Sequence, residues 1–460
     1  MWLLNVKDLL KNASSKIDRE ARKAALRILA AALDSLDPRT VVKKHVHRVN
    51  EILNIGNLTF NLDNFKRVFV VGGGKASGAM AEAIEEIVGS KITGGFVNIL
   101  RGTRLGLKTN RIILNEAGHP IPDEDGMNGA KSITELVKKA DKNDLIICII
   151  SGGGSALMPL PAGNITLQDK QNLTNNLLRC GGTIQEINVV RKHISELKGG
   201  QLAKIAYPAT LVCLILSDVV GDHLGTIASG PTVPDTTTFN DAIAILRKYN
   251  LWKSGIPESI KKRLISGMRK EIPETPKPDE SIFERTHNII VGNNRLAAFA
   301  AHQEAKRLGF NALVLSTAVE GEARHVGTIY AGIITEILVS DNPIPKPAAV
   351  IAGGETTVTV TGRGKGGRNQ ELVLGTSLKI NGLRGIAIAS IDTDGVDGYT
   401  DAAGAIADGE TVAHATKIGL NTTDFLGNND SYNFFSRVGD LIFTGPTGTN
   451  VNDLAVIVVL

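Results

Sequence analysis

KRVFVVGGGKASGAMAEAIEEIVG, residues 66–89, joins an unbroken apolar run to a glycine cluster and then to apolar residues at helical spacing. Similar runs recur as DLIICII (144–150) and ATLVCLIL (209–216), and helical patterns lie between them at 167–179 and 195–205. A strand that is apolar along its whole length is typical of a parallel sheet covered on both faces. This alternation predicts an α/β fold with a doubly wound, Rossmann-like parallel sheet.

The chain before and after this region suggests two domains. Residues 15–36 have apolar side chains at helical spacing and predict a helix that ends before Pro38. The stretch KEIPETPKPDESIF (270–283) has the composition of an exposed linker. We therefore predict a larger Rossmann-like domain over residues 1–275 and a smaller α/β domain over residues 284–460.

The sheet of the smaller domain is predicted to be mixed. TTVTVT (356–361) alternates polar and apolar residues, which favours a half-exposed strand in an antiparallel pair. The final run DLAVIVVL (453–460) either closes this sheet or returns to the larger domain.

The composition excludes several classes of function. With 4% aromatic residues, a net charge of +4 and no basic block, the chain is not typical of a nucleic-acid-binding protein. Its three cysteines are far apart and form no metal or disulfide pattern. The N-terminus lacks a signal peptide and no apolar run reaches membrane-spanning length, so we expect a cytoplasmic protein that does not bind membranes.

Three glycine clusters follow apolar runs, in RVFVVGGGKASG (67–78), LIICIISGGGSA (145–156) and TTVTVTGRGKGGRNQE (356–371). Glycines let the backbone turn tightly and bring N–H groups close to an anion. The first cluster carries Lys75, and the third carries Lys365 and Arg368. Together the clusters predict a phosphate-rich ligand.

Known phosphate motifs fit only in part. A Walker A motif fails because Phe69 stands where its first glycine belongs and Ala76 where its Ser or Thr belongs. Gly362, Gly364 and Gly367 satisfy GxGxxG, and Asp392 ends a strand further on, as in a dinucleotide site. The cationic residues of that loop favour a triphosphate or a substrate carboxylate instead.

SGGGSA (151–156) allows three interpretations, which are a phosphate cradle, a bare turn and a nucleophilic serine, although GxSxG is absent.

Acids cluster in LSDVVGDH (216–223) and SIDTDGVDGYTD (390–401), where they suit either a magnesium nucleotide or local backbone capping. An EF-hand fails at Ala403. His119 and His193 have no second ligand at metal spacing and are expected to be hydrogen-bonded structural residues.

Long motifs resemble those of the glycerate 2-kinases of the MOFRL family. They are GGGKASGAMA (72–81), NEAGHPIPDE (115–124), SGGGSALMPLP (151–161), INVVRKHISELKGGQLA (187–203), LILSDVVGDHLGTIASGPTVPD (214–235), GGETTVTVTGRGKGGRNQEL (353–372), SIDTDGVDGYTDAAGA (390–405) and GTNVNDL (448–454). The resemblance implies ATP-dependent phosphorylation of the 2-hydroxyl of D-glycerate. It also implies a divalent cation such as Mg²⁺ and two α/β domains with the active site in the cleft between them.

The resemblance places the functional lysine at Lys75 and the functional arginine at Arg368. Asp218 is our third catalytic candidate, and Asp218 and Asp394 are the candidates for holding the metal or, alternatively, accepting the hydroxyl proton. Nucleotide or substrate contacts are predicted at Gly73, Gly74, Ser77, Ser151, Gly152, Gly153, Gly154, Ser155, Gly366, Gly367, Asn369 and Glu371.

D-glycerate and ATP are the predicted partners, and a homodimer is a reasonable assembly for an enzyme of this size. Two alternatives stay open. An NAD(P)H-dependent hydroxypyruvate reductase would use a histidine paired with an acid and one true dinucleotide loop. A non-catalytic sugar-phosphate sensor would use the same glycine loops without the acids.

Overall fold

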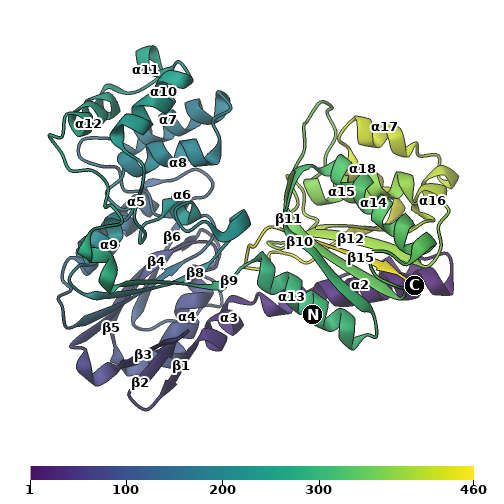
Figure 1. The fold of residues 1–460 in the computed structure, drawn as a ribbon, viewed down its shortest axis with the longest axis horizontal. Coiled ribbons are helices and arrows are strands. Elements are labelled where there is room, and N and C mark those ends of the chain that lie inside the picture. The colour runs from purple at the N-terminus through teal and green to yellow at the C-terminus, as the bar shows by residue number, and fades with distance from the viewer. Residues whose placement is uncertain (1) are drawn as a thin grey trace. The chain divides into compact units, whose positions relative to one another are not determined.

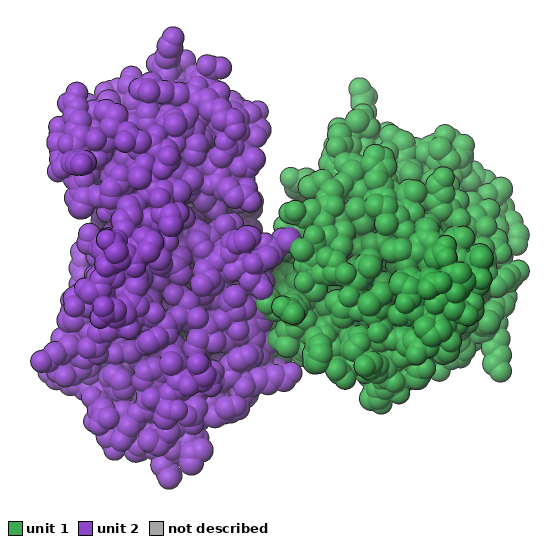
Figure 2. Space-filling view, in the orientation of Figure 1, with its two compact units in different colours: residues 1–37, 293–460 green, residues 38–292 purple. Residues whose placement is uncertain are grey.

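The computed structural model describes residues 2–460 and divides into two compact units (Figures 1 and 2). Unit 2 is Pro38–Gly292, and unit 1 combines the residues up to Asp37 with Asn293–Leu460. This division differs from the predicted domains 1–275 and 284–460 at both ends. The proline-rich stretch 270–283 lies inside unit 2, because the strand that follows it completes the sheet of that unit.

Unit 2 is built on a six-stranded sheet whose strands are all parallel, as predicted. The strand order is β6-β5-β4-β7-β8-β9. The strands are β4 (Arg67–Gly73), β5 (Ile92–Leu100), β6 (Ile112–Ala117), β7 (Asp144–Ile150), β8 (Thr210–Leu216) and β9 (Thr286–Gly292). All seven residues of β7 and of β8 are buried, which is why these runs are apolar throughout.

Helices cover the sheet of unit 2 and form a second layer beyond it (Figure 1). The helices beside the sheet are α3 (Pro38–His45), α4 (Ser77–Val88), α5 (Glu124–Val137), α6 (Gly154–Leu157) and α9 (Gln201–Ala206). A helical group with its own apolar core consists of α7 (Leu167–Arg179), α8 (Ile184–His193), α10 (Phe239–Lys248), α11 (Leu251–Ser254) and α12 (Glu258–Met268). A small antiparallel sheet holds β1 (Val46–Val49), β2 (Ile52–Ile55) and β3 (Leu58–Asn61).

Unit 1 contains a mixed six-stranded sheet in the order β10-β11-β15-β12-β13-β14. Only β10 and β11 pair in parallel. The strands are β10 (Asn311–Glu322), β11 (Ala348–Thr357), β12 (Ile386–Asp392), β13 (Gly404–Ala407), β14 (Leu441–Ile442) and β15 (Asp453–Val459). The final strand β15 therefore closes the sheet of unit 1 and does not return to unit 2.

Helices lie on both faces of the unit 1 sheet. One face is covered by α2 (Lys16–Ser35) and α13 (Asn294–Arg307), and α1 (Val6–Lys11) packs on α2. The other carries α14 (Ala323–Ser340), α15 (Arg368–Lys379), α16 (Thr411–Lys417), α17 (Thr422–Gly427) and α18 (Ser431–Val438) (Figure 1). The predicted helix over 15–36 is confirmed, and Ser15 caps it by accepting a hydrogen bond from the Asp18 N–H.

Two local predictions are corrected. Residues 195–205 are not one helix, because Gly199 and Gly200 adopt left-handed backbone conformations before α9 begins. Only Thr356 and Thr357 of TTVTVT belong to a strand, since β11 ends there. None of the helices within residues 2–460 is long and apolar enough to cross a membrane.

Candidate active site

The first two glycine loops meet at the carboxyl edge of the unit 2 sheet. The chain leaves β4 toward β5 on one side and reaches β7 on the other, so the β4–β7 pair is the topological switch point of the sheet. In doubly wound sheets ligands bind at this point, outside the carboxyl ends of the strands. Lys75 follows β4, Ser151–Gly154 follow β7, and Asp218 follows β8.

Hydrogen bonds hold the two loops together. The Lys75 N–H donates to the carbonyl of Gly152 at 2.8 Å, and the Ala76 N–H donates to the hydroxyl of Ser151 at 3.0 Å. The hydroxyls of Ser77 and Ser151 are 3.2 Å apart, and both side chains are fully buried. Ser77 and Ser151 therefore join the loops, and their contact with a ligand stays a prediction.

The glycines of these loops are required by close approach. A Cβ on Gly74, where φ is +156°, would lie 2.1 Å from the Ser151 hydroxyl oxygen. One on Gly152 would lie 2.4 Å from Oδ2 of Asp218, so this carboxylate lies against the loop that Lys75 contacts. Gly73 and Gly154 also pack on each other, because a Cβ on Gly154 would be 2.9 Å from the Gly73 carbonyl oxygen. The structure thus brings Lys75, the SGGG turn and Asp218 together.

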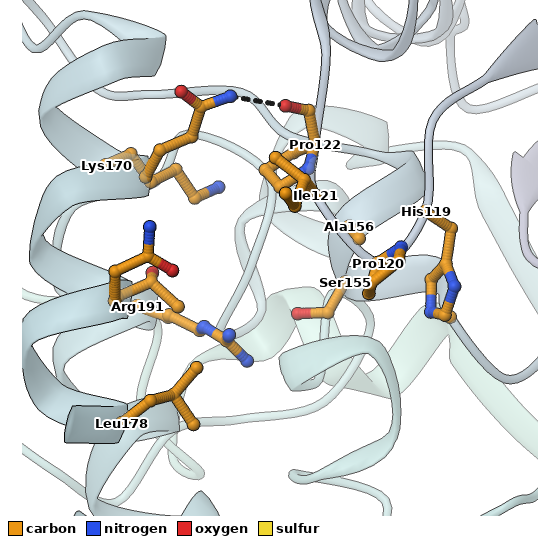
Figure 3. A pocket seen from close by; sticks show the side chains of 13 residues that line it. His119, Pro120, Ile121, Pro122, Ser155, Ala156, Lys170, Leu178 and Arg191 are labelled. Carbon is orange, nitrogen blue, oxygen red and sulfur yellow. Dashed lines mark hydrogen bonds between the residues drawn. The ribbon is translucent and has the colours of Figure 1, made fainter. Parts of the chain in front are cut away.

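A cavity of about 340 Å³ opens beside this edge, between the sheet loops and helices α7 and α8 (Figure 3). We call it the α7–α8 pocket. It is lined by His119, Pro120, Ile121, Pro122, Gly153, Ser155, Ala156, Lys170, Gln171, Thr174, Asn175, Leu178 and Arg191. The amide of Gln171 donates to the Pro122 carbonyl at 2.6 Å, which ties α7 to the loop after β6.

Two basic side chains, Lys170 and Arg191, line this pocket, and Lys198 lies beside it at Ser155. Burial and the neighbouring Arg191 lower the pKa of Lys170 to about 7. Burial, followed by Lys170 and Arg191, lowers the pKa of Lys198 well below its ordinary value. The Lys198 ammonium donates to the carbonyls of Ser155 at 3.0 Å and Ala228 at 3.4 Å. Basic side chains with lowered pKa values at a cavity are typical of a functional site, and these suit an anionic ligand.

Lys170, Arg191 and Lys198 belong to none of the predicted site residues, although the sequence carries one signal for Lys170. Lys170 lies on the same helical stripe as Leu173 and Leu177, the other buried residues of α7. A lysine on an apolar stripe is unusual, because lysine is rarely buried without a partner. His193, by contrast, is a structural histidine as predicted. It is fully buried and its Nδ1 lies 2.8 Å from the Val189 carbonyl.

In unit 1, Arg368 lies among carboxylates at the start of α15. Its guanidinium donates to Asp453 at 2.8 Å, to Asp392 at 2.9 Å and to Glu355 at 3.0 Å. Burial opposes the charge of Arg368, but the three carboxylates raise its pKa. Burial raises the pKa of Asp392 well above its usual range, and the nearby Asp394 and Asp453 raise it further. The environment of Arg368 is thus acidic, unlike the α7–α8 pocket.

The third glycine loop was predicted to offer its N–H groups to an anion, and the structure differs. The N–H groups of residues 361–365 are all donated to the segment 428–430. The glycines here serve close packing, because a Cβ on Gly362 would lie 2.2 Å from the Asn428 carbonyl oxygen and one on Gly366 would lie 2.2 Å from the Ser431 hydroxyl. Residues 361–365 therefore form no phosphate cradle.

The remaining predicted residues of unit 1 are mostly used inside it. Asn369 donates to Asp453 at 2.7 Å, and Glu371 is 2% exposed and paired with Arg324 at 2.6 Å. Their contact with a ligand stays a prediction. Gly367 caps α15, and a Cβ there would lie 2.2 Å from the carboxyl carbon of Asp397.

Asp394 begins a tight turn, where its Oδ1 accepts the Val396 N–H at 2.9 Å. Asp397 accepts the N–H groups of Asn369 at 3.1 Å and Gln370 at 2.9 Å. These contacts are the local capping that the sequence left open as one interpretation. Across residues 2–460, no group of three or more His, Cys, Asp and Glu side chains is arranged to hold a metal ion.

Comparisons with known proteins agree with this architecture. Residues 24–265 match the family described as a domain of unknown function, DUF4147, and residues 348–453 match the MOFRL family. A glycerate 2-kinase of Pyrococcus horikoshii is 42% identical over 96% of this chain and 98% of its own length. An Agrobacterium vitis relative with the provisional name hydroxypyruvate reductase is 40% identical, over 96% of this chain and 95% of its own.

A Thermotoga maritima protein named D-glycerate 2-kinase is 41% identical over 95% of this chain and 97% of its own length. A crystal structure of glycerate kinase from that organism superimposes with a TM-score of 0.84 at 40% identity, covering 95% of this chain and 99% of the other. Relatives of this identity extend along nearly the whole sequence. The chain therefore belongs to the glycerate 2-kinase family, with the MOFRL domain in its C-terminal part.

Proposed function

We propose that this protein transfers the γ-phosphoryl group of ATP to the 2-hydroxyl of D-glycerate, giving 2-phosphoglycerate and ADP. The observation that carries the proposal is the placement of Lys75 at the switch point of a doubly wound sheet, in a chain related to glycerate 2-kinases over nearly its full length. Phosphoryl transfer needs positioning and charge neutralisation more than covalent participation by the protein. Lys75, beside two glycine turns, supplies the charge neutralisation, and the turns supply the positioning.

The proposed roles follow from the contacts of each side chain. Lys75 neutralises charge on the phosphoryl group while its bond to the ADP oxygen breaks and its bond to the glycerate oxygen forms. Asp218, beside Gly152, accepts the proton that the 2-hydroxyl loses. Gly152, Gly153 and Gly154 supply the close approach of backbone to phosphate.

Arg368 is proposed as the second cation of the reaction. Its Nε and one N–H on each terminal nitrogen donate to carboxylates, which leaves two of the five guanidinium N–H groups for a phosphate or carboxylate oxygen. The three carboxylates fix the plane of the guanidinium. Arg368 therefore meets its ligand without reorganising.

We propose Mg²⁺ as the accompanying cation. The residues present form no cage of three ligands, but Mg²⁺ in kinases is held by one or two carboxylates together with the phosphates. Asp218 and Asp394 are the candidate carboxylates, and holding the metal is for Asp218 the alternative to accepting the hydroxyl proton. When bound, the metal neutralises charge on the phosphate oxygens.

The alternative of a hydroxypyruvate reductase finds less support. It needs one true dinucleotide loop, but the N–H groups of the GxGxxG loop over residues 361–365 are donated to residues 428–430. It also needs a histidine paired with an acid. His193 has such a partner, since its Nε2 is 3.3 Å from Glu274, but this histidine is fully buried. A sensor would not need Asp218 at the switch point.

Two assays on the purified protein test the proposal. D-glycerate with Mg-ATP is followed by ADP release, and hydroxypyruvate with NADH is followed by loss of NADH absorbance. We expect ADP release and no NADH loss. NADH loss alone would support the reductase, and silence in both assays would support the sensor.

A further inference from the structure

The α7–α8 pocket holds positive charge that the rest of unit 2 does not neutralise. Lys170 is 3% exposed, and its ammonium nitrogen has no hydrogen-bond partner. Within residues 2–460, neither Lys170 nor Arg191 forms an ion pair with a carboxylate, and Lys198 donates only to carbonyl groups. A buried ammonium without an anionic partner is costly to fold, and its presence at a cavity indicates an anionic ligand.

The walls of the pocket favour a small ligand. Pro120 and Ile121 line it from the loop after β6 and Leu178 lines it from α7, while Lys170 and Arg191 point into the space from α7 and α8 (Figure 3). Apolar walls reduce solvent screening and so strengthen the attraction of the two cations for an anion. A cavity of about 340 Å³ is at the lower end of the range of roughly 300–1,000 Å³ typical of drug-sized ligands. This size suits a small acid better than a nucleoside triphosphate.

The pocket borders the site assigned to phosphoryl transfer. Gly153 belongs both to the pocket lining and to the glycine turn, and a Cβ on Gly153 would lie 3.3 Å from Cγ of Lys75. It would also lie 3.1 Å from Nε2 of His119, which lines the pocket. In a 2-hydroxy acid the carboxylate carbon is bonded directly to the carbon that carries the reacting hydroxyl. The carboxylate must therefore lie in a space that adjoins Lys75, and this pocket does.

We propose that Lys170 and Arg191 bind the carboxylate of the hydroxy acid substrate, and that they select substrates with an anionic group next to the reacting hydroxyl. The inference rests on the proposed function and adds to it the residues that recognise the acceptor. Lys198 is a positioning residue, because its ammonium holds the Ser155 and Ala228 carbonyls beside the pocket.

This assignment has a consequence for pH dependence. The titratable and charged groups around Lys170 are Arg191 on α8, Lys198 after α8 and His119 after β6. Burial and Arg191 lower the pKa of Lys170 to about 7, so a growing share of the protein has a neutral Lys170 above that pH. A carboxylate binds the protonated form, so we expect the KM for D-glycerate to rise with pH above 7, by up to about tenfold per pH unit. Arginine stays charged throughout, so Lys170→Arg should remove this rise.

The experiment compares the wild type with Lys170→Met, Arg191→Met and Lys170→Arg, with Lys131→Met as the matched loss of an exposed lysine on α5. At a pH about one unit below 7, where Lys170 of the wild type is protonated, we expect the KM for D-glycerate to rise at least about tenfold in the two Met variants, the loss of one charge-assisted contact. The KM for ATP should change less than about twofold in these variants. In Lys131→Met, both KM values should change less than about twofold. Lys170→Arg should recover most of the glycerate affinity at pH 8 with a flat pH profile.

Three results would overturn the inference. In the first, the KM for ATP rises and that for D-glycerate does not, which would assign the pocket to a nucleotide phosphate. In the second, neither KM changes. In the third, Lys170→Met and Lys170→Arg lower the melting temperature and kcat alike with no change in either KM, which would indicate a structural role.

Calorimetric titration of D-glycerate without ATP separates this inference from the proposed function. If the wild type binds D-glycerate but does not phosphorylate it, the proposed function fails. Loss of that binding in Lys170→Met would still support the inference, and unchanged binding would contradict it.

Discussion

Lys75 is the residue on which the proposed chemistry depends most. Its N–H is fixed to the Gly152 carbonyl, so the start of its side chain is placed by the joined glycine loops and not by a mobile surface segment. A cation held in place before the reaction stabilises developing charge without reorganisation at the moment of transfer. The two serines that the sequence suggested as ligand contacts, Ser77 and Ser151, provide this rigidity.

Lys75→Ala should lower kcat by about 10²–10³-fold, the range found when one pre-organised donor to a developing charge is removed. The protein should remain folded, because the substitution leaves the N–H contact to Gly152 intact. Steady-state kinetics with a thermal melt measures both. Lys66→Ala removes an exposed lysine just before β4 and serves as the control. Normal turnover in a folded Lys75→Ala protein would remove the lysine from the mechanism.

Arg368→Lys should be almost as harmful to kcat as Arg368→Ala. An ammonium group cannot reproduce the planar set of contacts to Asp453, Asp392 and Glu355. The two buried acids, Asp392 and Asp453, therefore lose their shared partner. We expect a loss of kcat of at least about tenfold together with a lower melting temperature. Arg363→Lys, on an exposed residue of the same loop, is the control. Full activity in Arg368→Lys would show that only charge matters at this position.

At the scale of elements, α2 shows what the sequence predicted and what it did not. The spacing of apolar residues predicted a helix over 15–36, and the structure has it at Lys16–Ser35. An apolar stripe does not identify the sheet that it covers, so the pattern alone could not assign these residues to one unit or the other. The contacts that place α2 on unit 1 are long-range, such as the Gly385 N–H donating to Asp18 at 2.9 Å.

The sequence of a glycine loop also does not reveal which distant segment packs against it. The first and third glycine loops look alike in sequence, since each follows an apolar run and contains at least one basic residue. The two loops differ in the segment that packs against each of them. Residues 428–430 accept the N–H groups of the third loop, and these residues are distant in the sequence. Lys170 was not predicted as a site residue, because the motifs describe loops, whereas this lysine enters its pocket from the first turn of α7.

A buried ion-pair cluster anchors α2, and its loss should be costly. Arg22 is 1% exposed and donates to Asp408 at 2.6 Å and to Asp440 at 2.6 and 2.9 Å. Arg22→Ala leaves both acids without their cation, so unit 1 should lose about 3–5 kcal/mol of stability. Denaturant unfolding measures this loss. Lys23→Ala, on the exposed side of the same helix, should change stability by less than about 0.5 kcal/mol. Equal stability of the two variants would contradict the role of the cluster.

At the scale of the whole molecule, the chain crosses between units twice, at Asp37–Pro38 and at Gly292–Asn293. Unit 1 is therefore assembled from both ends of the sequence, and residues 38–292 form unit 2 between them (Figure 2). The sequence predicted both sheets correctly, because strand patterns are local. It placed the domain boundaries differently, because membership of a unit depends on packing between distant segments.

Deletion of residues 1–37 tests this assembly. Ala21, Ala25, Ile28 and Leu29 of α2 are fully buried, so the deletion exposes an apolar face of the unit 1 sheet to water. We expect the amides of β12 and β15 to lose protection from hydrogen exchange, while those of β4 and β7 keep it. Unchanged protection of β15 would show that α2 is dispensable to the unit.

The most direct test of the central claim is phosphorus NMR of the product formed from D-glycerate and Mg-ATP. We predict a resonance that coincides with authentic 2-phosphoglycerate, growing in step with ADP in the wild type and absent in Lys75→Ala. A product that coincides with 3-phosphoglycerate would contradict the regiochemistry. ATP left intact by the wild type in the presence of D-glycerate would contradict the proposed kinase itself.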